Sequence, residues 1–97
     1  MHSTIPEYVL DRLLRLFYLE KTVSKALLFG SRAKGIHRNN SDIDIALVGS
    51  GIPKSLNTKL REAARLYPID IVNMEACDNK DLLDEIKKDG IVIYERK

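Results

Sequence analysis

The sequence predicts an α/β (α+β) fold, a small mixed β-sheet with helices packed on it. Short β-branched runs bounded by glycine, proline or asparagine alternate with longer stretches whose apolar residues recur at helical spacing. The composition, 44% hydrophobic and 31% charged, is that of an ordinary folded domain. Since 97 residues leave room for one hydrophobic core, we expect a single domain over residues 1–97.

The first helix is expected from Ile5 to Leu19. The segment Thr4-Ile5-Pro6-Glu7 has the spacing of a capping box, in which the threonine hydroxyl and the glutamate carboxylate each accept a free backbone amide. One face of this helix is expected to cover the sheet, because apolar residues recur on it at helical spacing. These residues are Val9, Leu10, Leu13, Leu16 and Phe17.

After this helix the chain is expected to alternate between strands and helices. Val23–Phe29 and Asp42–Val48 are the first two strands, and Ser31 is expected to cap a short helical turn that Gly35 ends. The later elements are a helix over Lys54–Tyr67 that Pro68 stops, a strand over Ile69–Asn73, a helix capped by Asp78 or Asn79 that ends near Gly90, and a strand over Ile91–Tyr94.

The composition also excludes several kinds of protein. No apolar run approaches the ~20 residues that a membrane helix needs, and no secretory signal is visible, so we expect a cytoplasmic protein. Cys77 stands alone, which excludes an internal disulfide and a cysteine-based zinc site. His2 and His37 are isolated and are expected at the surface. The net charge of +2 is too small to indicate nucleic acid as a direct ligand.

Gly30 and Ser31 follow the first strand in a way that suits an anion. Glycine lets the backbone approach a ligand closely, and the amides of a following helical turn point outward. Nearby positive charge comes from Arg32, Lys34 and Arg38. The same residues also fit a plain strand-to-helix turn, in which glycine serves the geometry and serine the cap. Two known phosphate loops are excluded, because a Walker A loop needs lysine where Ile36 stands and a dinucleotide fingerprint needs glycine at position 32.

Asp42 and Asp44 are the second candidate feature. Side chains alternate along a strand, so both aspartates project from one side while Ile43 and Ile45 project from the other. Two like charges so close are unfavourable without a cation, and magnesium prefers carboxylate oxygens. An exposed strand edge would explain the pair without a metal. The apolar residues around them instead suggest a buried strand, where unpartnered carboxylates are costly.

Asp70 is a third acid in an otherwise apolar strand. It fits either a strand-end residue paired with a cation or a further metal ligand. Three carboxylates on adjacent strands can hold two divalent ions, which together stabilise the attacking and leaving oxygens of a displacement at phosphorus. We therefore expect Asp42, Asp44 and Asp70 to form one metal-binding and catalytic cluster.

These motifs together resemble the signature of the DNA polymerase β-like nucleotidyltransferase superfamily. The matching segments are Phe29-Gly30-Ser31-Arg32-Ala33-Lys34-Gly35 and Ser41-Asp42-Ile43-Asp44-Ile45-Ala46-Leu47. More narrowly, nearly the whole chain resembles the minimal nucleotidyltransferases, or MntA family. The resemblance implies that Gly30 and Ser31, with Arg32 beside them, bind the nucleotide triphosphate. It further implies that Asp42 and Asp44 bind two Mg²⁺ ions and that Asp70 helps to activate the attacking hydroxyl.

The resemblance also implies a partner. Larger relatives carry helical domains that bind the acceptor, and we expect no such domain here, because the sequence ends soon after the expected core. In minimal nucleotidyltransferases a helical HEPN-family toxin is bound and adenylylated on tyrosine. We therefore expect a hetero-oligomer in which this chain, as antitoxin, moves AMP from ATP to a partner hydroxyl. The alternatives are a catalytically silent antitoxin that neutralises its partner by binding, and transfer to a small molecule or an RNA 3′ end.

Overall fold

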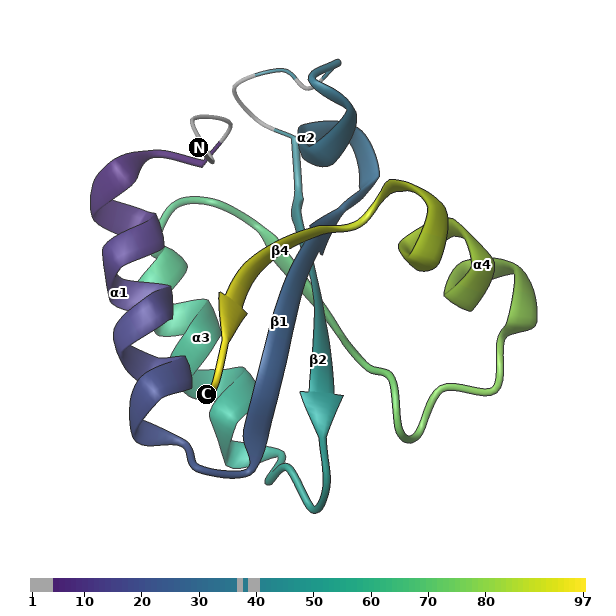
Figure 1. Cartoon of the computed structure of the whole chain (residues 1–97). Coiled ribbons are helices and arrows are strands. Elements are labelled where there is room, and N and C mark those ends of the chain that lie inside the picture. Colours follow the sequence, from purple (N-terminus) through teal and green to yellow (C-terminus); the bar gives the residue numbers. More distant parts are fainter. Residues whose placement is uncertain (1–4, 37, 39–40) are drawn as a thin grey trace.

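A mixed sheet forms the centre of the chain in the computed structural model, which describes residues 5–36, 38 and 41–97 (Figure 1). Its strands are β1 (Val23–Phe29), β2 (Ile43–Gly49), β3 (Ile69–Asn73) and β4 (Ile91–Glu95). They lie in the order β3-β2-β1-β4. β1 pairs antiparallel with β2 and β4, whereas β2 pairs parallel with β3. The predicted fold class is confirmed.

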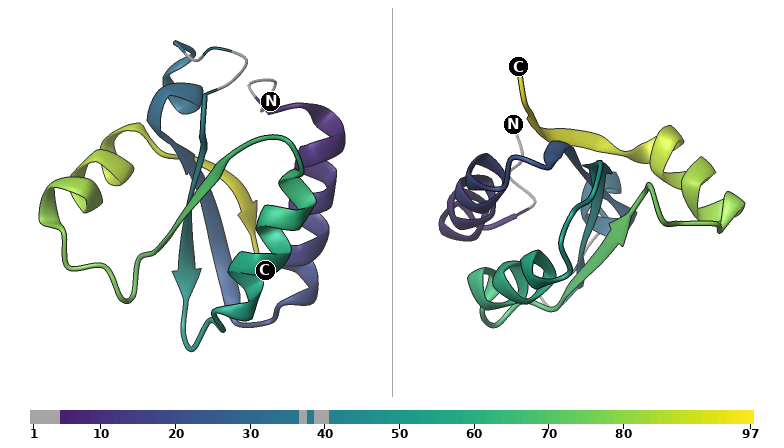
Figure 2. Two further views of the ribbon diagram at one scale, coloured as in Figure 1. Left: turned by 180° about the vertical axis from the view of Figure 1, so that it is seen from behind. Right: turned by 90° about the horizontal axis from the view of Figure 1, so that it is seen from below.

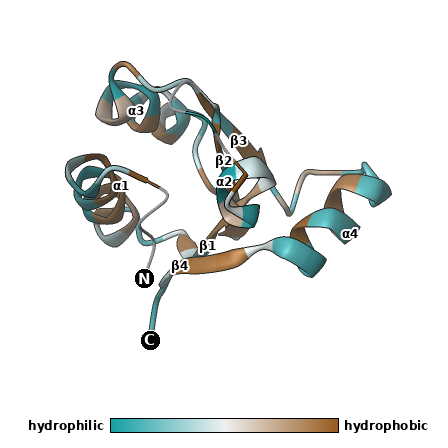
Figure 3. Cartoon of the chain, turned by 90° about the horizontal axis from the view of Figure 1, so that it is seen from above, coloured by the Kyte–Doolittle hydropathy of each residue, from teal (hydrophilic) through white to brown (hydrophobic). Residues whose placement is uncertain are grey.

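Helices cover both faces of this sheet. They are α1 (Glu7–Leu19), α2 (Gly30–Lys34), α3 (Ser55–Ala64) and α4 (Lys80–Asp89). Figure 2 shows α1 and α3 side by side on one face and α4 on the other, while α2 lies at the end of β1. Hydrophilic and hydrophobic residues alternate along α1, α3 and α4, as expected for helices with one buried face (Figure 3).

Two hydrophobic clusters fill the space between the layers. The larger one joins α1 and α3 to the sheet and includes Ile43, Ile45 and Leu47 of β2, all fully buried. The smaller one lies under α4 and joins Ile86 to Ala46, the β2 residue between Ile45 and Leu47. Alternation along β2 therefore places its even-numbered residues on the α4 face of the sheet.

The start of α1 differs from the prediction. The helix begins at Glu7 rather than Ile5, with Pro6 as its N-cap and no side-chain cap. The amides of Val9 and Leu10 both donate to the Pro6 carbonyl oxygen at 3.0 Å. Proline has no amide and so suits this position, which makes a capping box unnecessary. Thr4, on which that box depended, lies outside the described residues.

The other helix ends show both agreement and error. Ser31 does not cap the short helix, since it lies inside α2 after an N-cap at Phe29. Gly35 does end α2, in the left-handed conformation with φ 76°. Asn79 is the cap of α4, and its side chain accepts a hydrogen bond from the Leu82 amide at 3.1 Å.

Helix α3 ends earlier than the sequence predicts. It covers Ser55–Ala64, because Arg65 turns the backbone to φ 56° before Pro68 is reached. β2 begins one residue later than predicted and β4 extends one residue further, to Glu95. The surface positions expected for His2 and His37 fall outside the described residues. Within the described part of the chain, no helix is long and apolar enough to span a membrane.

Candidate active site

Three carboxylates meet at one end of the β2–β3 pair. β2 and β3 run parallel with Asp44 opposite Asp70, and Asp42 lies two residues before Asp44, directly ahead of β2. Side chains at matched positions of parallel strands share a face, and so do residues two apart. Each of the three residues offers a carboxylate oxygen, and these oxygens lie within 4.8 Å of one another. The clustering predicted from the sequence is present.

The three acids are less buried than the apolar neighbours in the sequence suggested. Asp42 and Asp70 are exposed and Asp44 is half-buried. The apolar residues flanking Asp44 face α1 and α3, whereas the acids lie on the α4 face at the end of the sheet. The apolar residues beside the acids are therefore buried, whereas the carboxylates themselves remain accessible to a ligand.

Gly30 is placed directly against Asp44. The β1 residue before it, Phe29, pairs with Asp44 across the antiparallel ladder. Gly30 has φ 75°, and a Cβ atom at this position would overlap Asp44 Oδ2. Glycine is thus required twice, for its backbone conformation and for the space that the carboxylate occupies.

The surroundings of Asp44 disfavour its negative charge. Burial is the largest cause, followed by the charges of Asp70, Asp42 and Glu85, and together they raise its pKa from 3.8 to about 6 despite the opposing attraction of Arg32. A half-buried carboxylate with like charges on several sides is costly to ionise. A bound cation would remove that cost, since it reverses the sign of the local field.

The donor set of this cluster fits magnesium. All three donors are carboxylate oxygens, which hard divalent cations prefer. Oxygens bound to one Mg²⁺ ion lie at most about 4 Å apart, so carboxylate oxygens that are within 4.8 Å of one another need only small movements to share an ion. Two carboxylates are exposed and free to adjust, so Asp42, Asp44 and Asp70 could hold one ion or share two.

Arg32 holds the segments that carry these acids. It is 2% exposed, and its Nε and Nη2 atoms donate to the Ser41 carbonyl oxygen at 3.1 and 3.0 Å. Its guanidinium carbon lies 5.6 Å from the centroid of the Tyr67 ring. Ser41 immediately precedes Asp42, and Tyr67 lies shortly before Asp70. The guanidinium thereby joins α2 to the segments that lead into β2 and β3, the two strands at which the acids cluster.

Other predicted basic residues lie around the same loop. Arg38 is exposed, and its amide donates to Ser41 Oγ at 2.8 Å. Lys34 Nζ lies 3.7 Å from Asp89 Oδ2, which links α2 to α4. Ser31 is half-buried, and its carbonyl oxygen accepts the Ile36 amide at 3.1 Å. These contacts shape the loop, and none of them occupies the Ser31 hydroxyl.

Sequence reasoning missed one residue that acts on the site and the surroundings of another. Glu85 comes from α4, and its charge reaches Asp44 only because that helix packs on the same face of the sheet. Arg32 was expected beside Gly30 and Ser31 as a residue that binds the triphosphate, whereas its side chain is buried and donates to the Ser41 carbonyl oxygen. Nothing in the local sequence distinguishes it from Lys34 and Arg38, which are exposed.

Gly30→Ala is expected to abolish magnesium binding. The new methyl group must displace the Asp44 carboxylate, whereas Gly35→Ala has the same left-handed backbone but nothing within 4 Å of its Cβ. Both variants should lose about 1 kcal/mol of stability from the backbone conformation. Thermal unfolding with and without MgCl₂ measures the difference.

The magnesium-induced rise in melting temperature should persist in Gly35→Ala and vanish in Gly30→Ala. Equal rises in both variants would show that the absence of a side chain at Gly30 is not needed for the Asp44 carboxylate to bind magnesium.

Asp44→Asn is expected to stabilise the metal-free protein in a pH-dependent way. Because the folded-state pKa of Asp44 is raised to about 6 from 3.8, the folded wild type binds the extra proton between these values and loses stability as pH rises through them. Asparagine cannot ionise. In EDTA, the melting temperature of the variant should therefore exceed that of the wild type by more at pH 7.5 than at pH 4.5.

The same substitution should remove the response to magnesium, because it removes a charged ligand. A variant less stable than wild type at pH 7.5 in EDTA would contradict the repulsion argument.

Comparison with known proteins places this site in a family. A family model described as polymerase beta, nucleotidyltransferase, matches residues 12–97. A search of curated proteins finds no match. The family match confirms the resemblance inferred from the glycine-serine and aspartate motifs.

Solved structures share the fold. One, described as a toxin-antitoxin with AMP-PNP, is 22% identical with a TM-score of 0.75, and the match covers 91% of this chain and 74% of that one. Another, the toxin-antitoxin MntA-HepT, is 20% identical with a TM-score of 0.70, covering 94% and 74%. With the family model matching most of its length and its acids clustered as described, the chain belongs to the polymerase beta nucleotidyltransferase family.

Proposed function

We propose that this protein is a Mg²⁺-dependent nucleotidyltransferase that moves AMP from ATP onto a hydroxyl group. The observation that carries the proposal is the cluster of Asp42, Asp44 and Asp70, whose carboxylate oxygens lie within 4.8 Å of one another beside Gly30. Such a cluster is unfavourable in an inert fold and useful for transfer at phosphorus.

The residues divide into a metal half and a phosphate half. Asp42 and Asp44, with Asp70, would hold two Mg²⁺ ions, which supply positive charge against the phosphate oxygens during transfer. Gly30 and Ser31 would bind the triphosphate, the first through its backbone and the second through its hydroxyl. ATP as the donor also fits the cytoplasmic setting expected from the sequence.

In the proposed reaction the acceptor oxygen attacks the α-phosphorus of ATP. A bond forms between that oxygen and the α-phosphorus, and the bond from the α-phosphorus to the bridging oxygen breaks, so that pyrophosphate leaves. Asp70 is the more exposed partner in the Asp44–Asp70 pair, and we assign it to the acceptor side. There its carboxylate would accept the hydroxyl proton as attack proceeds.

We further propose that the acceptor is a tyrosine of a HEPN-family toxin partner, with this chain as the antitoxin. The support is the fold shared with the toxin-antitoxin MntA-HepT and with a toxin-antitoxin bound to AMP-PNP. The protein would then act as a protein adenylyltransferase within a hetero-oligomer.

The direct test combines the purified chain, its HEPN partner, ATP and MgCl₂, with intact-mass analysis of the partner. The partner should gain the mass of AMP, and both Asp42→Ala and omission of magnesium should reduce the gain to background. Lys87→Ala, a change at an exposed residue of α4, serves as the control.

Modification of the partner that persists in a pure Asp42→Ala sample would contradict the proposed nucleotidyltransferase function of this site. If Asp44→Asn still neutralises the toxin without modifying it, the protein acts as a binding antitoxin instead.

Arg32→Lys is expected to lower kcat and stability while leaving KM for ATP nearly unchanged. Lysine cannot reproduce the paired Nε and Nη2 contacts with the Ser41 carbonyl oxygen, and losing them should cost roughly 1–3 kcal/mol. Arg38→Lys, in the exposed part of the same loop, should change neither quantity.

Steady-state kinetics and chemical denaturation measure these effects. A raised KM for ATP with unchanged stability would favour the phosphate contact that the sequence predicts for Arg32, over a positioning role.

A further inference from the structure

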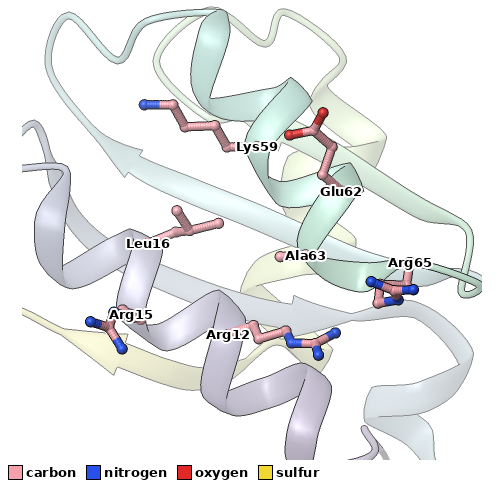
Figure 4. A pocket seen from close by; sticks show the side chains of 7 residues that line it. All are labelled: Arg12, Arg15, Leu16, Lys59, Glu62, Ala63 and Arg65. Carbon is pink, nitrogen blue, oxygen red and sulfur yellow. The ribbon is translucent and has the colours of Figure 1, made fainter.

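An open pocket lies between α1 and α3, on the side of the molecule away from the carboxylates. Its volume is about 420 Å³, and Figure 4 shows its lining from close by. We call it the α1–α3 pocket. α1 contributes Arg12, Arg15 and Leu16, while Lys59, Glu62, Ala63 and Arg65 come from α3 and its C-terminal end.

The α1–α3 pocket is strongly positive. Four of its lining side chains are cationic and one is a carboxylate, although the whole chain carries a formal net charge of only +2. Among the described residues, ion pairs within 4.0 Å join Lys25 to Glu95 and Lys34 to Asp89, so none neutralises a cation of this pocket. Such a concentration of unpaired charge attracts an anionic ligand.

The centre of the pocket is apolar. Leu16 points into the space between the helices and faces Ala63, and both side chains are half-buried (Figure 4). Arg12 extends toward the end of α3 where Arg65 lies. A ligand that fills this pocket therefore needs apolar groups along its middle and negative charges along its edges.

This combination favours a protein segment over nucleic acid. Sites for single-stranded nucleic acid join a cationic groove to exposed aromatic rings on which bases stack. No aromatic side chain lines the described α1–α3 pocket. The Tyr8 ring nearby lies 5.4 Å from the guanidinium of Arg12, so that cation is already placed over it. An acidic amphipathic helix offers both required features and packs readily against two neighbouring helices.

A second pocket continues this surface toward the edge strand β3. It has a volume of about 400 Å³, shares Arg65, and adds Arg61, Leu66 and Ile69 to the lining. Leu66 is 93% exposed and follows the turn at Arg65, so it offers an apolar anchor at the end of the positive surface. Ile69 is next in the chain to Asp70 of the carboxylate cluster.

We propose that the α1–α3 pocket is the docking surface for an acidic amphipathic helix of a protein partner. This deepens the proposed function, and the role of the docked partner as acceptor rests on that function. Docking of the helix does not depend on the proposed function, because α1 and α3 cover the face of the sheet opposite the acids. Binding of the partner and binding of metal are therefore separable by mutation.

The test uses a fluorescein-labelled peptide of ~18 residues, about five helical turns, with leucines at helical spacing and glutamates on the flanks. Fluorescence anisotropy at low salt (~50 mM) should show saturable binding to the full chain. The double variant Arg12→Glu with Arg15→Glu should weaken binding at least about tenfold. The double variant Lys80→Glu with Lys87→Glu changes the total charge equally on exposed residues of α4, and should leave binding unchanged.

A peptide with lysine in place of glutamate should not bind. Absence of binding by the acidic peptide, or equal weakening by both double variants, would overturn the proposal. Tighter binding of a single-stranded RNA of similar length, lost in the Arg12 and Arg15 variant, would overturn it in favour of nucleic acid.

The magnesium-induced rise in melting temperature is recorded for the same samples. It should survive in both double variants, which shows that they are folded with an intact carboxylate cluster. If the Arg12 and Arg15 variant loses peptide binding but keeps this rise, the substitutions have affected the docking site alone. Peptide binding without any magnesium response or AMP transfer would leave the docking site in place and refute the proposed function.

Discussion

The parallel pairing of β2 with β3 is the constraint on which the site depends. Its register sets Asp44 opposite Asp70, and alternation along β2 adds Asp42 to the same face. The same alternation sends Ile43, Ile45 and Leu47 into the larger core, so the packing of α1 and α3 holds the acids in place. A shift of one residue in this register would bury the carboxylates and expose the core.

Residues around the three acids, rather than the acids themselves, reduce the cost of bringing their like charges together. Arg32 attracts Asp44 from a buried position and also ties the Ser41 backbone ahead of Asp42. Gly30 removes the side chain that would otherwise stand where the Asp44 carboxylate lies. Glu85 of α4 acts in the opposite direction. Its negative charge raises the pKa of Asp44 and makes the ionised carboxylate harder to keep without a cation.

The motifs and the periodicity of the sequence were enough to predict the sheet, most of the helices and the meeting of the three acids. Strands β1 and β3 have the predicted bounds, and a residue unsuited to a strand marks one end of each: Gly30 follows β1 and Pro68 precedes β3. The errors lie where one residue's backbone overrides a pattern: Pro6 replaces the capping box, and Arg65 ends α3 before Pro68.

Tertiary contacts explain what sequence reasoning could not reach. The burial of Arg32 depends on Ser41 across a loop and on Tyr67 far along the chain, and the charge of Glu85 matters only once α4 has packed. The pocket between α1 and α3 likewise arises from two helices whose exposed cations look unremarkable when each is read alone.

The raised pKa of Asp44 has a consequence for how this protein would respond to selection in the laboratory. Natural proteins commonly trade stability for a strained functional site. A library screened only for resistance to heat in the absence of divalent cations would enrich neutral residues at position 44, and under the proposed function the survivors would be stable but inactive. Under the proposed magnesium binding, a screen with magnesium present would instead retain the Asp44 carboxylate, since ligand binding stabilises the folded state.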